Sequence, residues 1–138
     1  MFEGEYLNGE RNGKGKEYYY EGNLKFDGEY LNGNRWEGKG YDNNGRLISK
    51  CEYINGEKNG KGKIYKQNYN LYFEGEYLNG KRNGKGKDYD YLGNLIFEGE
   101  YKNDKKHGKG KEYYYNGRLK YEGEYLYGFK LKGKLYMK

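Results

Sequence analysis

The sequence of 138 residues has no proline, alanine, valine or threonine, and it contains a single cysteine, Cys51. One cysteine excludes an internal disulfide framework and fits a reducing compartment. No segment approaches the ~20 consecutive apolar residues that a membrane span needs, and no apolar signal segment follows Met1. We therefore expect a cytoplasmic protein, in which association with the cytoskeleton or with a membrane remains open.

Aliphatic side chains are scarce, which excludes a thick two-layer core. Hydrophobic residues make up 33% of the chain, 21 residues are tyrosine, and 35% of the residues are charged. That balance by itself is typical of disordered chains. The aromatic content of 20% favours order, because each buried ring removes about 150–250 Å² from water. The composition thus predicts a thin, ordered structure held together by aromatic rings.

The most informative feature is an internal repeat. Residues 2–9 read Phe-Glu-Gly-Glu-Tyr-Leu-Asn-Gly, and residues 73–80 repeat them without change. Variants begin at Phe26, Ser49, Phe97 and Tyr121, so successive units start 24, 23, 24, 24 and 24 residues apart. We interpret residues 1–138 as a single array with a degenerate last unit that acts as a cap. The units span approximately 2–25, 26–48, 49–72, 73–96, 97–120 and 121–138.

Each unit has the pattern of a β-hairpin. Its first residues alternate with period two, an Asn-Gly turn follows, and a Gly-Lys-Gly-Lys segment returns. One face then carries rings over glycine backbone, and the other carries cross-strand pairs of opposite charge. The predicted partners in the first unit are Tyr6 with Gly13, Gly4 with Gly15, Glu5 with Lys14 and Glu3 with Lys16; in the fourth and fifth units they are Glu74 with Lys87, Glu76 with Lys85, Glu98 with Lys111 and Glu100 with Lys109.

The units resemble the MORN repeat (membrane occupation and recognition nexus), whose pattern reads Tyr-x-Gly-x-x-x-x-Gly-x-x-His-Gly-x-Gly. His107-Gly108-Lys109-Gly110 supplies the His-Gly-x-Gly part, and Asn12, Asn59 and Asn83 stand at the histidine position of other units. The resemblance covers essentially the whole chain. It implies an all-β fold, a single-layer antiparallel sheet of about six stacked β-hairpin repeats that forms an elongated, twisted ribbon or groove. It also implies no enzymatic activity.

Three units depart from this pattern. The second is interpreted as carrying an inserted residue in Arg35-Trp36-Glu37-Gly38 and the sixth as carrying the same insertion in Lys130-Leu131-Lys132-Gly133, which makes Trp36 and Leu131 equivalent. The third unit has Ser49 and Cys51 at the usual aromatic and glycine positions, and Tyr69 where a turn glycine belongs. No unit precedes Phe2, so we expect the first strand to be an open edge that favours self-association, for example as a homodimer.

No arrangement of residues indicates catalysis, a cofactor or a metal. Ser49 and Cys51 lie more than two units from His107, about 20–30 Å at ~4.8 Å per strand, which is far beyond hydrogen-bond reach. One histidine and one cysteine cannot build a metal site. No Gly-Lys pair is followed by Ser or Thr, as a P-loop requires. We expect a protein that is not an enzyme, in which Cys51 replaces glycine and His107 packs and forms hydrogen bonds.

The favoured function is a scaffold for protein–protein interaction. An aromatic, glycine-floored groove would bind a peptide or helix of a protein partner, because binding energy concentrates on exposed rings. The residues predicted to line this groove are Tyr6, Tyr30, Trp36, Tyr53, Tyr77, Tyr101 and Tyr125.

The alternative function is peripheral association with acidic phospholipids. The net charge is +6, and stacking would align unmatched basic residues of the turns along one edge. Against an anionic leaflet each would contribute about 1 kcal/mol. The predicted edge consists of Arg11, Arg35, Lys58, Lys81, Arg82, Lys105, Lys106 and Lys130. A third class, glycan binding, is disfavoured by the single tryptophan and the charge-paired face, and no recognised motif supports binding to nucleic acid.

Overall fold

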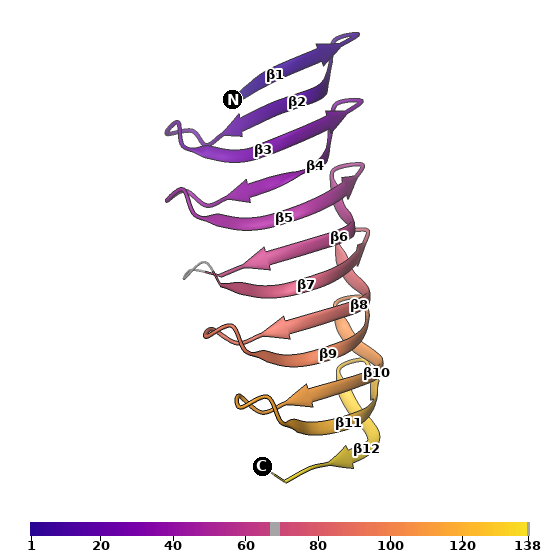
Figure 1. Cartoon of the computed structure of the whole chain (residues 1–138). Coiled ribbons are helices and arrows are strands. Elements are labelled where there is room, and N and C mark those ends of the chain that lie inside the picture. Colours follow the sequence, from indigo (N-terminus) through magenta and orange to yellow (C-terminus); the bar gives the residue numbers. More distant parts are fainter. Residues whose placement is uncertain (67–69, 138) are drawn as a thin grey trace.

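The structure is a computed structural model that describes residues 1–66 and 70–137. Within these residues twelve strands form one antiparallel sheet in which each strand pairs with its neighbours in sequence (Figure 1). Six hairpins therefore stack into a single-layer ribbon, and the predicted fold class is confirmed. The strands are β1 (Phe2–Leu7), β2 (Glu10–Tyr18), β3 (Leu24–Leu31), β4 (Asn34–Tyr41), β5 (Leu47–Ile54), β6 (Glu57–Tyr65), β7 (Leu71–Leu78), β8 (Lys81–Tyr89), β9 (Leu95–Lys102), β10 (Lys105–Tyr113), β11 (Leu119–Leu126) and β12 (Phe129–Leu135).

Two kinds of connection lie at the two edges of the ribbon (Figure 1). Tight turns close the hairpins at one edge, here the turn edge; Asn8 and Gly9 both have positive φ angles, 51° and 81°, which suits the twist of the strands they join. Longer loops join successive hairpins at the other edge, here the loop edge. Asp90 organises one of them, because its carboxylate accepts a hydrogen bond from the backbone N–H of Leu92. The predicted irregularity at Tyr69 lies outside the described residues.

Aromatic rings cover one face of the sheet, here the ring face, and form the core. Phe73 is 1% exposed and packs edge-on against Tyr77 and against Tyr101 of the next hairpin, with ring centroids 5.8 and 5.4 Å apart. Its ring also covers Gly86, where a Cβ atom would lie 2.7 Å from the ring. Glycine is therefore required beneath the ring. The buried residues of the ring face are Phe26, Tyr30, Ser49, Cys51, Tyr53, Phe73, Tyr77, Phe97, Tyr101, Tyr121 and Tyr125.

The predicted register is confirmed around the paired glycines. Gly4 lies opposite Gly15, and Glu3 lies opposite Lys16. Glycine therefore meets glycine on the ring face, while an acid meets a lysine on the other face. The same register holds for Glu74 with Lys87 and for Glu98 with Lys111.

The register differs from the prediction next to the turns. Tyr6 pairs with Arg11 instead of Gly13, because the residues after Arg11 bulge out of β2. Gly13 has a φ of +87°, which is strained for any residue with a side chain. The carboxylate of Glu5 accepts a hydrogen bond from the backbone N–H of Lys14 at 2.8 Å. Glu5 is thus bound by the backbone of the bulge.

The second and sixth units are each one residue shorter in this bulge, so the predicted insertion is wrong. Gly38 pairs with the central glycine of β3 and is therefore equivalent to Gly15, not to the bulge glycine Gly13. The bulge in β4 contains one residue, Trp36, which the pairing skips. The pairing skips Leu131 in β12 in the same way, which confirms that Trp36 and Leu131 are equivalent.

The two unusual residues of the third unit compensate each other. In the fourth unit the ring of Phe73 is 2.8 Å from the place where a Cβ atom of Gly75 would lie, so the aromatic residue and a side chain at the glycine position are incompatible. In the third unit Ser49 replaces the aromatic residue and leaves space for Cys51. Both are buried, at 7% and 4% exposure. Ser49 therefore removes the ring that the side chain of Cys51 would otherwise meet, while the backbone of the next strand, which lies at 2.6 Å in the fourth unit, must also shift to admit a Cβ atom.

Candidate functional site

The face opposite the rings carries an open groove. It crosses β3 to β11, has a volume of about 1240 Å³, and is lined by acidic and lysine side chains with glycine backbone between them. Strands at ~4.8 Å spacing give it a length of about 38 Å. Ordinary small-molecule sites occupy about 300–1,000 Å³ and are enclosed, so the shape of this groove is typical of a surface that binds a linear segment.

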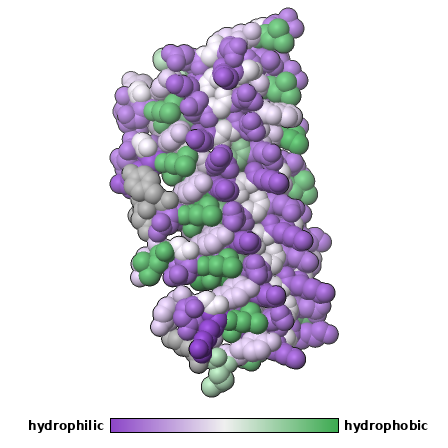
Figure 2. All heavy atoms as spheres, in the orientation of Figure 1, coloured by the Kyte–Doolittle hydropathy of each residue, from purple (hydrophilic) through white to green (hydrophobic). Residues whose placement is uncertain are grey.

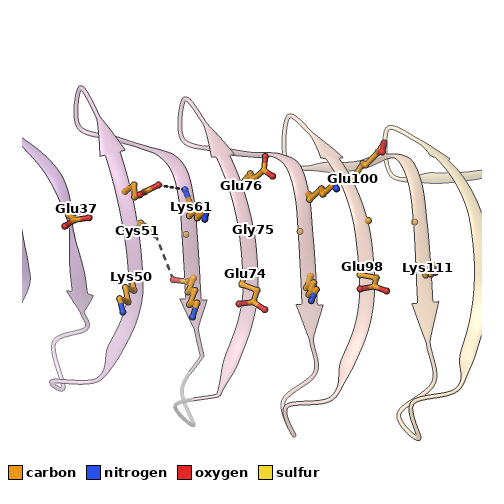
Figure 3. Close-up of a pocket in the computed structure, with 18 of the residues that line it drawn as sticks. Glu37, Lys50, Cys51, Lys61, Glu74, Gly75, Glu76, Glu98, Glu100 and Lys111 are labelled. Carbon is orange, nitrogen blue, oxygen red and sulfur yellow. Dashed lines mark hydrogen bonds between the residues drawn. The ribbon is translucent and has the colours of Figure 1, made fainter.

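Two rows of charged residues run along the groove, because residues two apart in a strand point to the same face. Figure 3 shows both rows on neighbouring strands, with Glu76 nearer the turn edge and Glu74 nearer the loop edge. With the outer strands included, the turn-side row is Glu5, Lys14, Glu29, Glu37, Glu52, Lys61, Glu76, Lys85, Glu100, Lys109, Glu124 and Lys132. The loop-side row is Glu3, Lys16, Asp27, Lys39, Lys50, Lys63, Glu74, Lys87, Glu98, Lys111, Glu122 and Lys134.

The signs of these charges follow a rule. An odd-numbered strand contributes two acids, as β7 does with Glu74 and Glu76, and an even-numbered strand contributes two lysines. Cross-strand neighbours therefore have opposite charges, and each such pair stabilises the sheet by about 0.2–1 kcal/mol. Two residues reverse the rule, Glu37 in β4 and Lys50 in β5.

The sheet itself binds many of the groove acids. In the turn-side row Glu52 accepts a hydrogen bond from the backbone N–H of Lys61 at 2.7 Å. In the loop-side row Glu98 accepts one from the hydroxyl of Tyr113 at 2.5 Å, and burial together with this bond raises the pKa of Tyr113 to about 12. The lysine side chains of both rows are exposed. Lysines are therefore the groove groups most available to a ligand.

None of the seven residues predicted to line an aromatic groove lines the groove that the structure has. Tyr30, Tyr53, Tyr77, Tyr101 and Tyr125 are buried on the ring face, and Tyr6 and Trp36 are 60% and 48% exposed away from the groove lining. The hydroxyl of Tyr101 donates to Asp88, and that of Tyr125 donates to Glu112. The expectation of an aromatic groove is corrected, because the rings fill the space over the glycines and leave the charged face open.

Most residues of the predicted lipid-binding edge contact rings. The guanidinium groups of Arg11 and Arg35 lie 4.3 and 4.2 Å from the ring centroids of Phe2 and Phe26. Arg35 also forms an ion pair with Glu17 at 2.8 Å. Similar ring contacts involve Lys58, Arg82, Lys106 and Lys130, whereas Lys81 and Lys105 are exposed at the turn edge. Lipid binding by this edge stays a prediction.

A line of exposed aliphatic residues, which the sequence reasoning missed, borders the turn-side row. Leu31, Ile54 and Leu78 follow acids of that row by two residues and therefore point to the same face. They are 43%, 53% and 49% exposed, and Leu7 and Leu126 continue the line. Figure 2 shows hydrophobic residues in a column along the turn edge. The signal was available, because these residues occupy the same place in their units.

The residues that could suggest catalysis lie apart. Ser49 and Cys51 are buried on the ring face, and burial raises the pKa of the Cys51 thiol. His107 lies at the turn edge, where its Nδ1 accepts a hydrogen bond from the backbone N–H of Tyr127 at 3.2 Å. Within residues 1–66 and 70–137 no group of three or more His, Cys, Asp or Glu could hold a metal ion. The same described residues contain no helix long and apolar enough to cross a membrane.

Comparison with known proteins identifies the repeat. A family model described as MORN repeat matches residues 2–24, 52–70, 73–87 and 97–117, which together make up more than half of the chain. No curated protein matches the chain. The matches cover most of the regular hairpins, whereas residues 25–51, which contain Trp36, Glu37 and Lys50, lie outside them.

Proposed function

The chain belongs to the MORN repeat family, and on this premise we propose that it is a non-catalytic scaffold that binds a helical segment of a partner protein along the charged groove. The observation that carries the proposal is the groove, a continuous open surface from β3 to β11 with exposed lysines in both rows. At about 38 Å it is long enough for a helix of about 25 residues.

The chemistry of the surface supports a protein ligand. Lysines and acids alternate over the floor of the groove, and the exposed Leu31, Ile54 and Leu78 border one side. Protein interfaces combine apolar contacts with polar groups that set orientation and register. A helix with apolar residues toward the aliphatic line and charged residues toward the rows would satisfy both.

A helix fits the spacing of the strands better than an extended segment does. One helical turn rises ~5.4 Å, close to the ~4.8 Å between strands, so that one residue per turn meets each successive strand. In an extended segment the residues that face the same side are about 6.6 Å apart. Because this spacing exceeds the spacing of the strands, the side chains of an extended segment would no longer face the charged residues after two strands.

The test is a selection of displayed helical peptides of about 20 residues, each about 30 Å long, against the whole chain. We expect recovered peptides to bind the native protein and to lose about tenfold in affinity when Lys85 and Lys87 are both changed to Glu, because two cations then disappear from the groove. The matched control changes Lys81 and Lys105 to Glu, which alters the net charge equally at exposed positions of the turn edge.

Two results would contradict the proposal: failure to recover any peptide, or equal binding to the groove variant and the native protein. Stronger loss in the Lys81 and Lys105 variant would instead favour the turn edge, and flotation of the same variant with acidic vesicles would then test lipid binding. Self-association stays a separate prediction; β1 and β12 each pair with one neighbouring strand, and sedimentation would measure it.

A further inference from the structure

Three lysines stand side by side in the loop-side row. Lys50 occupies the position that is acidic in every other odd-numbered strand, and it pairs with Lys39 of β4 on one side and with Lys63 of β6 on the other. We call Lys39, Lys50 and Lys63 the lysine triplet. Lys50 alone creates the triplet, because Lys39 and Lys63 lie on even-numbered strands, which normally contribute lysine.

Three glutamates stand side by side in the turn-side row over nearly the same strands. Glu37 occupies the position that is lysine in every other even-numbered strand, and it pairs with Glu29 of β3 and with Glu52 of β5. We call Glu29, Glu37 and Glu52 the glutamate triplet. Figure 3 shows Glu37 and Lys50 on adjacent strands, on opposite sides of the groove floor.

The central residues of the triplets, Glu37 and Lys50, lie between like charges on both sides, whereas the outer residues each have a partner in the sheet. The side chains of both triplets are exposed, and no ion pair within the described part of the chain involves any of them. Like charges directly opposite each other destabilise a pair of strands. Lys50 also removes an acceptor, because the equivalent acids Glu74 and Glu98 bind tyrosine hydroxyls at 2.7 and 2.5 Å. Local stability therefore gives no reason for the two reversals.

The two reversals replace a charge pattern that alternates along the groove with one that differs between the two sides of the groove. From β6 to β11 both charges of a strand have one sign and those of the next strand have the other, so the charges cancel at distances beyond the strand spacing. In the triplets, acids line the turn side and lysines line the loop side over about 10 Å. Like charges in a row add, and their field extends over the Debye length of about 8 Å. To an approaching ligand, this part of the groove is therefore negative on the turn side and positive on the loop side.

We infer that the two triplets form the specificity site of the groove and select a helix with basic residues on the flank facing the turn edge and acidic residues on the flank facing the loop edge. The inference rests on the proposed function, and it assigns the part of the groove that distinguishes one helix from another. Residues spaced by three and four along a helix share one flank and cover about 10 Å in two turns, which equals the length of each triplet. Leu31 and Ile54 would pack against the aliphatic stems of the helix's basic residues.

The test uses two stapled, alanine-based helical peptides of about 14 residues, about 21 Å long, as probes. The matched probe has three lysines on one flank and three glutamates on the other. The mirrored probe exchanges the lysines and glutamates. Since the groove has a direction and the helix has a handedness, both probes are also made in reversed order. We expect one matched orientation to bind best and its mirrored form to bind about tenfold more weakly.

The decisive variants restore the strand-to-strand alternation of charge at the two exceptional positions. Lys50→Glu and Glu37→Lys each remove two like-charge pairs, and we expect each to weaken the matched probe about tenfold without lowering the melting temperature. The control is Lys134→Glu in β12, the same chemical change in the same row but outside the groove lining, about 34 Å from Lys50. It should leave binding of the matched probe within about twofold of native.

Every outcome bears on the inference. Binding of the matched probe that persists in Lys50→Glu, or equal binding of matched and mirrored probes, overturns it. If the native protein binds selected library peptides but neither probe, the specificity site is wrong while the proposed function stands; if it binds no peptide at all, both fail. A native dimer that dissociates in Lys50→Glu would show that a second copy occupies the groove, which also overturns the inference.

Discussion

The stretch from β3 to β5 and the stretch from β6 to β11 are built from the same repeat, yet they differ in packing, pairing and charge. In the later stretch Phe73 and Phe97 cover glycines of their own hairpins, and charges alternate from strand to strand. In the earlier stretch Ser49 and Cys51 replace phenylalanine and glycine, the bulge at Trp36 is shortened, and Glu37 and Lys50 reverse the charges.

In this chain, residues that depart from the repeat occur in pairs that compensate each other. Cys51 requires the small Ser49, because a ring at that position would occupy the space of its side chain. Glu37 and Lys50 reverse together on neighbouring strands, so the net charge of the groove is unchanged. The first set preserves packing. The second preserves overall charge but not its distribution, which is why we assign it to binding.

The largest expected effect is the loss of the ring in the regular stretch. Phe73→Ser removes a side chain that is 1% exposed and contacts two tyrosines, and we expect the free energy of unfolding to fall by about 3–5 kcal/mol. Urea denaturation monitored by circular dichroism measures it. A loss below about 1 kcal/mol would show that the rings do not form the core.

The second prediction concerns the glycine beneath the ring. Gly75→Cys should destabilise the chain by about 2–3 kcal/mol, because its Cβ atom would lie 2.6 Å from the carbonyl oxygen of Lys85 and 2.8 Å from the ring of Phe73. Combined with Phe73→Ser, it recreates the arrangement of Ser49 and Cys51. The double variant should therefore lose at least about 1 kcal/mol less than the sum of the single changes. Strict additivity would contradict the compensation.

The third prediction compares two buried tyrosines. The hydroxyl of Tyr101 donates to Asp88, whereas the equivalent position beside Tyr53 is Gly40. Tyr101→Phe should lower the free energy of unfolding by about 1.5–2 kcal/mol, because a partly buried carboxylate loses its donor. Tyr53→Phe should cost less than about 1 kcal/mol. Equal losses in thermal denaturation would remove the distinction between the two stretches.

The fourth prediction is a loss of stability at alkaline pH to which two tyrosines of the regular stretch contribute. Burial and hydrogen bonds to Glu74 and Glu98 raise the pKa values of Tyr89 and Tyr113 to about 12, whereas the unfolded pKa is about 10. The folded state therefore holds these protons longer, and their contribution to stability is complete below about pH 10 and is lost as pH rises toward about 12. Tyr89→Phe should flatten this decline in melting temperature, and an unchanged slope would contradict the assignment.

The smallest expected effect is a gain. Lys50→Glu replaces two like-charge pairs with two opposite-charge pairs and gives the neighbouring strand an acceptor, so we expect stabilisation by up to about 1 kcal/mol. Lys87→Glu makes the reverse change in the regular stretch and should destabilise by a similar amount. Chemical denaturation at low salt measures both. Changes of the same sign in the two variants would show that the alternation of charge does not stabilise the sheet.

Much of the fold could be predicted because its signals are local. Period-two alternation and the Asn-Gly turns indicated the strands, and the pairing of Gly4 with Gly15 followed from placing side-chain-free positions together. The bulge at Gly13 was missed, because the pairing of Gly4 with Gly15 was continued toward the turn with one residue opposite one residue, which places Tyr6 opposite Gly13 instead of Arg11. The shortened bulge at Trp36 was predicted as an insertion, because Gly38 was aligned with the bulge glycine Gly13 and not with Gly15.

The candidate site was harder to predict. The sequence showed that rings and charges lie on opposite faces, but the groove was assigned to the rings. That error arose because a ring looks exposed within one hairpin and becomes buried only against the next, as Phe73 does against Tyr101. The charge reversal at Lys50 was visible in the repeat, yet its two lysine neighbours come from β4 and β6 and depended on the register.

The repeat, the strands and the residues that share a face are properties of the sequence, because they follow from the period of the chain and from turns made by adjacent residues. The direction of the groove, the burial of the tyrosines and the two charge triplets arise only in the stacked sheet. They depend on contacts between neighbouring hairpins, such as Phe73 with Tyr101 and Lys39 with Lys50, and no single unit contains all the partners that decide them.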